Sequence, residues 1–146
     1  MGKILITGGA GYIGSHIVRL LVEAGMEVLV IDDLSAGHRE AVSGVPLFEG
    51  DYSDPDLLQR VLLAGDIEFI VHMAAFTEVG QSVKDPSAYY ANNLSGSLML
   101  LDMARRHRVR GIVFSSTAAV YGEPERLPIT EEIGRASCRE RVYVLV

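Results

Sequence analysis

The sequence predicts an α/β fold in which a doubly wound parallel sheet is covered by helices on both faces. Strand-like and helix-like segments alternate along the chain, which is typical of parallel strands joined by helical crossovers. Two strand-like segments, Val28–Ile31 and Ile112–Phe114, are continuously apolar, as expected when both faces of a sheet are covered. A glycine-rich turn joins the first strand to the first helix. Because such crossovers are right-handed, we expect the strand order 3-2-1-4-5.

The expected elements follow from local patterns. Apolar residues recur with helical spacing at Ile13, Ile17 and Leu20. Two further helix starts are marked by an aspartate followed by proline, a capping residue and a first-turn residue, at Asp54 and Asp85. The expected elements are strands at Lys3–Ile6, Glu27–Ile31, Val45–Glu49, Phe69–Val71 and Gly111–Phe114, and helices at Tyr12–Ala24, Asp54–Ala64 and Pro86–His107.

Composition limits the classes of partner. The 146 residues are 49% apolar, enough for the core of one domain. A net charge of −6 argues against nucleic acid and anionic membrane surfaces as partners. Met1 leads directly into a strand without the longer apolar run of a signal peptide, and no apolar stretch is long enough to span a bilayer. We expect a cytoplasmic protein without a metal site.

The glycine turn predicts a dinucleotide site, because it lies between a strand and a helix with glycines three residues apart. Gly8 allows the tight turn, Gly11 lets the backbone approach a pyrophosphate, and Gly14 lets helix and strand pack closely. Tyr12 and Ile13 open the helix, whose N-terminal N–H groups and dipole favour phosphates. The spacing disfavours the alternative of an ordinary glycine-rich turn without a ligand.

The second strand ends in Asp32 and Asp33, and Asp32 lies 18 residues beyond Gly14. An acid at about this distance binds the adenosine ribose in such folds. A carboxylate there favours NAD, because the 2′-phosphate of NADP would bring like charges together. Arg39 lies close enough in sequence to weaken this preference. Both aspartates are also compatible with turn chemistry; we predict that Asp32 is functional, and Asp33 is left undecided.

Several sequence blocks, occurring in the same order, resemble the extended short-chain dehydrogenase/reductase family, and within it the UDP-glucose 4-epimerases. The resemblance covers Met1 to about Glu132, and it implies a Rossmann-type sheet with NAD as cofactor. The blocks are Thr7–His16, Asp32–Ser35, Gly50–Asp51, His72–Ala75, Val79–Ser82, Tyr89–Asn93 and Phe114–Gly122.

The resemblance also implies roles for individual residues. For His72 we expect local hydrogen bonding rather than a role as base, and a turn hydroxyl remains an alternative for Ser116 and Thr117. The implied cofactor-binding residues are Asp32, Asp33, Leu34 and Ser35 beyond the second strand, Asp51 and Tyr52 flanking the adenine, Ala74, Ala75 and Phe76 beyond the fourth strand, and Asn92 and Ser115 toward the nicotinamide. Thr117 is the implied catalytic hydroxyl.

The implied reaction takes hydride from C4 of a UDP-hexose onto NAD⁺, rotates the 4-keto intermediate and returns hydride to its other face. A UDP-sugar substrate and a homodimer are implied as partners. The family's base is the tyrosine of Tyr-x-x-x-Lys, a motif that this sequence lacks; the partner of Tyr143 would fall beyond the end of the chain. No acidic residue follows Thr117 at Ala118 and Ala119, which favours an epimerase over a dehydratase. A non-catalytic NAD-binding module and another nucleotide-sugar epimerase or dehydratase remain alternatives.

The resemblance ends abruptly after Glu132. The segment Ile133–Val142 resembles the in-frame translation of a DNA-sequencing adapter, and such segments are excluded from fold reasoning. We therefore expect an incomplete NAD-binding domain at 1–132 and a non-native tail at 133–146, with the last strands and the C-terminal substrate lobe missing. Such a chain would bind NAD at most. The single cysteine, Cys138, lies in the tail, so no disulfide is implied.

Overall fold

The structure is a computed structural model that describes residues 2–117 and 127–130. The chain divides into two compact units, Met1–Phe114 and Ser115–Val146. In the second unit, the peptide bond between Leu127 and Pro128 is cis. All regular elements of the described chain belong to the first unit.

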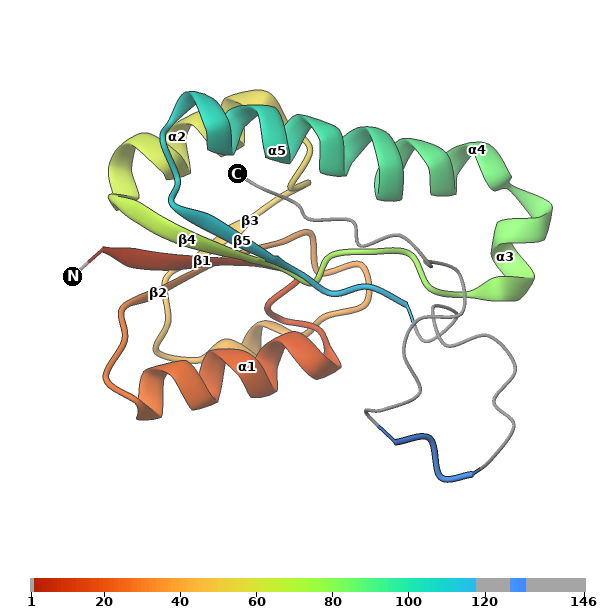
Figure 1. Ribbon diagram of the computed structural model, residues 1–146, viewed down its shortest axis with the longest axis horizontal. Coiled ribbons are helices and arrows are strands. Elements are labelled where there is room, and N and C mark those ends of the chain that lie inside the picture. Colours follow the sequence, from red (N-terminus) through yellow and green to blue (C-terminus); the bar gives the residue numbers. More distant parts are fainter. Residues whose placement is uncertain (1, 118–126, 131–146) are drawn as a thin grey trace. The chain divides into compact units, whose positions relative to one another are not determined.

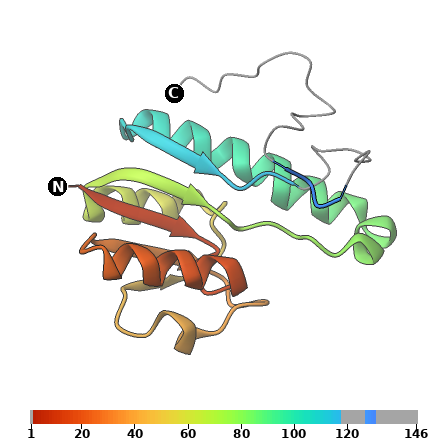
Figure 2. The same cartoon turned by 60° about the horizontal axis from the view of Figure 1, so that its bottom comes forward.

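Five parallel strands form one sheet in the order β3-β2-β1-β4-β5, which confirms the predicted topology. Figure 2 shows β1, β4 and β5 side by side. The strands are β1 (Lys3–Thr7), β2 (Val28–Asp32), β3 (Leu47–Glu49), β4 (Ile67–His72) and β5 (Gly111–Phe114). β1 lies at the centre, where its residues pair with β2 on one side and β4 on the other. All carboxyl ends of the strands therefore lie at the same edge of the sheet.

Helices cover both faces of this sheet (Figure 1). α1 (Tyr12–Glu23) packs on one face, while α2 (Pro55–Gly65) and α5 (Ser97–Arg106) pack on the other. Each face has its own apolar core. On the α1 side the buried residues include Ile6, Val18, Val28 and Val30. On the α2 and α5 side they include Leu5, Ile31, Leu58, Val61, Ile70, Leu100 and Met103.

The predicted single helix Pro86–His107 is wrong in one respect, because a π-helical segment interrupts it. α4 (Pro86–Tyr89) leads into η2 (Tyr90–Gly96), and α5 follows. Side chains compete here with the regular helix ladder: the Tyr52 hydroxyl donates to the Asn92 carbonyl, and the Ser97 hydroxyl donates to the Asn93 carbonyl at 2.7 Å. Such π-bulges are frequent at functional sites.

Other differences concern element boundaries and short helices. The third strand begins at Leu47 rather than Val45. The 3₁₀ helix η1 (Arg39–Val42) and the helix α3 (Val79–Lys84) were not predicted. Each has six residues or fewer, which is too short for a clear helical periodicity.

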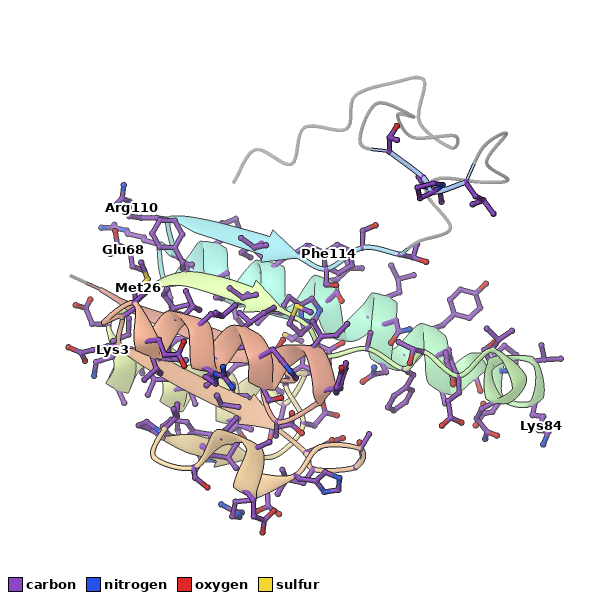
Figure 3. All side chains as sticks on the ribbon, turned by 90° about the horizontal axis from the view of Figure 1, so that it is seen from below. Lys3, Met26, Glu68, Lys84, Arg110 and Phe114 are labelled. Atoms are coloured by element: carbon purple, nitrogen blue, oxygen red, sulfur yellow. The ribbon has the colours of Figure 1, made fainter. Side chains whose placement is uncertain are left out.

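β4 is longer than predicted, because it includes Ile67 and Glu68 before the predicted strand and His72 after it. The Glu68 carboxylate accepts a hydrogen bond from the Gly2 N–H at 2.9 Å and pairs with the Arg110 guanidinium. These two contacts, the first above all, lower the pKa of Glu68. Figure 3 shows Glu68 and Arg110 side by side at the edge where β4 and β5 begin, with Phe114 at the far end of β5. The charge on a strand residue is thus satisfied by neighbours distant in sequence.

Candidate functional site

A cleft lies beyond the carboxyl ends of β1, β2, β3 and β4, where an open α/β sheet binds its ligands. Of the predicted site residues, it is lined by Gly8, Gly11, Asp32, Asp33, Ser35, Tyr52, Ala74, Ala75, Phe76 and Asn92. The lining also includes Ile31, Ala36, Gly37, Gly50 and Met73, which sequence reasoning did not assign to the cofactor. Gly50 carried a signal, since it directly follows the predicted strand Val45–Glu49 and a glycine there permits close backbone approach.

The three glycines of the first turn occupy different environments. Gly8 has a φ of +71°, and a Cβ on it would lie 2.6 Å from the Ala74 backbone nitrogen. A Cβ on Gly14 would lie 2.1 Å from the Gly8 carbonyl oxygen. By contrast, a Cβ on Gly11 would meet only the Gly8 oxygen, at 3.4 Å. Gly8 and Gly14 are therefore required by packing, whereas Gly11 leaves open space in the cleft.

The N-terminus of α1 begins at this open position. Gly11 is the N-cap, and no side chain caps the helix there. The first intrahelical bond runs from the Ser15 N–H to the Gly11 carbonyl at 2.9 Å, so the preceding N–H groups of Tyr12, Ile13 and Gly14 lie outside the helical ladder. These donors and the positive end of the helix dipole form an anion-binding arrangement beside the cleft.

Asp32 ties the end of β2 to the glycine turn. Its side chain is buried, with Oδ2 accepting from the Ala10 N–H at 2.8 Å and Oδ1 accepting from the Leu34 N–H at 2.9 Å. A carboxylate offers about four acceptor positions, so roughly half of its capacity remains for a ligand in the cleft. The same side chain both holds the two turns together and offers acceptors at the predicted ribose position.

Asp33 and Asp51 make local turns. Asp33 Oδ1 accepts from the Ser35 N–H at 2.9 Å and the Ser35 hydroxyl at 2.6 Å. Asp51 Oδ1 accepts from the N–H and the hydroxyl of Ser53, each at 2.7 Å. Leu34, between Asp33 and Ser35, adopts a left-handed φ of +58°. Turn chemistry therefore accounts for much of what these two aspartates do in the structure.

The opposite wall of the cleft is held by Tyr52 and Asn93. The Tyr52 hydroxyl donates to the Asn92 carbonyl, and burial raises the pKa of Tyr52. Asn93 Oδ1 accepts from the Phe76 N–H at 2.8 Å, while its Nδ2 donates to the Phe76 carbonyl at 2.9 Å. Asn93 thus fixes the loop beyond β4, a role that sequence reasoning missed because its partner lies 17 residues away.

His72 is a buried link in a chain of hydrogen bonds. Its Nδ1 lies 2.6 Å from Thr7 Oγ1, and its Nε2 lies 2.9 Å from Ser97 Oγ. Because the Ser97 hydroxyl donates to the Asn93 carbonyl, Ser97 Oγ accepts from His72 Nε2–H and Nδ1 accepts from Thr7. Burial lowers the pKa of His72 to about 4. His72 is engaged in hydrogen bonds, as predicted, but its partners lie 65 and 25 residues away in the sequence. The imidazole is neutral near pH 7.

Two predicted residues belong to the other unit of the chain. Ser115 and Thr117 follow β5, and their roles stay predictions. The segment Ala118–Ala119, Tyr143 and the proposed tail lie outside the described residues. Within residues 2–117 and 127–130, no cluster of three or more histidine, cysteine or carboxylate side chains could hold a metal ion, and no helix is long and apolar enough to cross a membrane.

Comparisons with known proteins agree with this geometry. A UDP-glucose 4-epimerase of Halalkalibacterium halodurans is 50% identical over 128 residues, which cover 88% of this chain and 38% of that protein. UDP-glucose 4-epimerase from Brucella ovis in complex with NAD matches with a TM-score of 0.83 and 41% identity, covering 92% of this chain and 42% of that one. The enzyme from Bifidobacterium longum in complex with NAD⁺ and UDP matches with a TM-score of 0.80 and 38% identity, covering 89% and 41%.

The chain therefore spans well under half the length of these relatives. The model of the NAD dependent epimerase/dehydratase family matches residues 4–143, nearly the whole chain. The glycine turn, the strand order and the cleft beyond the strand ends all fit this match. The chain belongs to the NAD dependent epimerase/dehydratase family.

Proposed function

We propose that this chain is the cofactor-binding part of an enzyme that epimerises a UDP-hexose at C4 with NAD. The observation that carries the proposal is the cleft in which the glycine turn, the N-terminus of α1 and the buried Asp32 meet. The similarity to UDP-glucose 4-epimerases, some solved with NAD or UDP, supports the substrate class. UDP-glucose and UDP-galactose are the expected substrates, and a homodimer is the expected assembly of the whole enzyme.

The residues of the cleft fit NAD. The open space at Gly11 and the N–H groups at the start of α1 would receive the pyrophosphate. The remaining acceptor positions of Asp32 would receive the hydroxyls of the adenosine ribose. Tyr52 and Asp51 would flank the adenine, and Phe76 and its neighbours would line the rest of the cofactor. When bound, NAD supplies a hydride acceptor and, in its reduced form, a hydride donor.

The chain's own residues have defined tasks in this proposal. His72 does not act as a base, because both of its ring nitrogens are engaged and its pKa is about 4. Thr117 is the proposed catalytic hydroxyl, and Ser115 is proposed to lie toward the nicotinamide of the cofactor. Removing the proton from the C4 hydroxyl needs a base with a suitable pKa. The sequence has no Tyr-x-x-x-Lys pair, so we expect this chain to bind NAD without epimerising a UDP-sugar.

Calorimetric titration of the chain with NAD⁺ and with NADP⁺ tests the cofactor assignment. We expect binding of NAD⁺ and weaker binding of NADP⁺. Gly11→Ala is the sharpest variant, because its methyl group would enter the open space of the cleft without a close protein contact. We expect unchanged stability and affinity for NAD⁺ lowered at least about tenfold, a loss of about 1.4 kcal/mol.

Gly80→Ala is the matched control. Gly80 lies in α3, and a Cβ there would have nothing within 4 Å. This variant should bind NAD⁺ as the parent chain does. A parent chain that folds yet binds neither dinucleotide would refute the proposed cofactor, as would a Gly11→Ala variant with unaltered affinity for NAD⁺.

We further propose that residues 133–146 are a non-native tail. The match of the family model extends through residue 143, so the origin of this segment is best decided at the level of DNA. The experiment is to sequence the source DNA that encodes Glu131 to Val146. An adapter sequence in those codons would support the proposal; a different coding sequence that runs to a natural stop would refute it and favour a short NAD-binding protein.

A further inference from the structure

The end of β3 lies beside the proposed ribose position. Glu49, the last residue of β3, pairs in register with Asp32, the last residue of β2. The Gly50 N–H then donates to the Asp32 carbonyl at 3.0 Å, and Gly50 lines the cleft. The Glu49 carboxylate therefore starts from a strand position adjacent to the residue that is proposed to bind the ribose.

The loop after β2 brings Arg39 to Glu49. It folds back on the glycine turn: the His38 N–H donates to the Ala10 carbonyl at 3.0 Å, and a Cβ on Gly37 would lie 2.8 Å from the Ala10 carbonyl carbon. Arg39 follows directly and begins η1. Its guanidinium donates to the Glu49 carboxylate and forms an ion pair with it.

The ion pair between Arg39 and Glu49 determines which charges would surround the ribose of a bound dinucleotide. Arg39 is the only lysine or arginine between Arg19 and Arg60 in the sequence. A dinucleotide with a 2′-phosphate needs a cation near the adenosine ribose, whereas a free 2′-hydroxyl needs only an acceptor such as Asp32. While Glu49 holds Arg39, the guanidinium is neutralised, and a 2′-phosphate would face the carboxylates of Asp32 and Asp33 alone.

We propose that Glu49 is a specificity-determining residue that excludes 2′-phosphorylated dinucleotides by keeping Arg39 engaged. The inference rests on the proposed function, because it concerns the same cofactor cleft. Both side chains of the pair are more than half exposed, and exposed ion pairs contribute little to stability. Their substitution should therefore alter cofactor choice while the chain remains folded.

The experiment measures the dissociation constants of NAD⁺ and NADP⁺ by calorimetry for the parent chain and three variants. Glu49→Gln frees Arg39, and we expect affinity for NADP⁺ to rise by up to about fivefold, the gain that the loss of one exposed ion pair allows. Affinity for NAD⁺ should not change. Arg39→Gln combined with Glu49→Gln has the same net charge as the parent chain, and it should return the ratio of the two affinities to the parent value.

Glu27→Gln is the control for a general change in charge. Glu27 precedes β2 and pairs with Lys3 at 3.7 Å, at the amino ends of the strands and opposite to the cleft. The Glu27→Gln variant removes one negative charge, as Glu49→Gln does, and should leave the ratio of the NAD⁺ and NADP⁺ affinities unchanged. The inference is overturned if Glu49→Gln leaves the ratio unchanged while NAD⁺ still binds, or if the double variant keeps the gain. Failure of every variant and the parent to bind NAD⁺ would instead overturn the proposed function.

Discussion

Replacing Gly8 with alanine should destabilise the chain far more than the same change at Gly25. The two glycines have nearly the same φ, +71° and +76°. They differ in their surroundings. A Cβ on Gly8 would lie 2.6 Å from the nitrogen and 2.8 Å from the Cα of Ala74, whereas a Cβ on Gly25 would have nothing within 4 Å.

The expected loss of unfolding free energy has two parts, the strain of the backbone conformation and the steric overlap of the new methyl group with its neighbours. A left-handed conformation costs an alanine roughly 1–2 kcal/mol, and this cost applies to both variants. The entropy that each substitution removes from the unfolded chain is also the same for both. Overlap arises only at Gly8, where the neighbours are backbone atoms that cannot rotate away; overpacking of this kind costs about 1–3 kcal/mol. We therefore expect Gly8→Ala to lose about 1–3 kcal/mol more than Gly25→Ala.

Urea unfolding followed by far-ultraviolet circular dichroism measures this difference. With a slope of about 1–3 kcal/mol per molar urea, the two midpoints should differ by roughly 1 M. The slopes themselves should agree, which would show that both variants unfold the same structure. Equal midpoints for the two variants would refute the reasoning, because they would mean that the turn beside Ala74 has room for a methyl group.

Two further predictions concern stability. Burial lowers the pKa of His72 from 6.5 to about 4, so the unfolded chain binds more protons below pH 6.5, and this contribution to stability is lost as the pH falls toward 4. The loss of unfolding free energy from this effect should be about 2 kcal/mol between pH 7 and pH 5. Urea unfolding at the two pH values measures it, because the shift of the midpoint should be smaller in His72→Gln than in the parent chain. An equal shift in the variant would contradict the assignment. Asp54 caps α2 by accepting from the N–H groups of Asp56 and Leu57, so Asp54→Ala should lower the free energy of unfolding by about 1 kcal/mol. Asp54→Ser should restore most of that loss in thermal unfolding, and no difference between alanine and serine would argue against capping.

The predictions that succeeded rest on local chemistry. The alternation of apolar strands and amphipathic helices predicts the sheet, and the handedness of crossovers then gives its strand order. Strand β5 has the predicted bounds, Gly111–Phe114, because a short apolar run bounded by a glycine is a clear signal. Ten of the predicted site residues line the cleft, since residues that follow parallel strands come together at one edge, and their binding roles stay predictions.

Long-range partners explain the failures. Glu68 lies outside the predicted strand Phe69–Val71, yet the structure includes it in β4, where Gly2 and Arg110 satisfy its carboxylate. The π-helical segment Tyr90–Gly96 follows from contacts of Tyr52 and Phe76 with the asparagines of that segment. No spacing within the helix indicates such contacts.

The sequence by itself determined the fold class and the strand order and predicted a dinucleotide site, because hydrophobic period, turn residues and crossover handedness are local properties of the chain. Only the tertiary structure decided how the polar side chains are used. It assigned Asp32 to the Ala10 N–H group, placed His72 between Thr7 and Ser97, and paired Arg39 with Glu49. Hydrogen bonds and ion pairs depend on distances between segments that are remote in sequence, and those distances exist only after the sheet has formed.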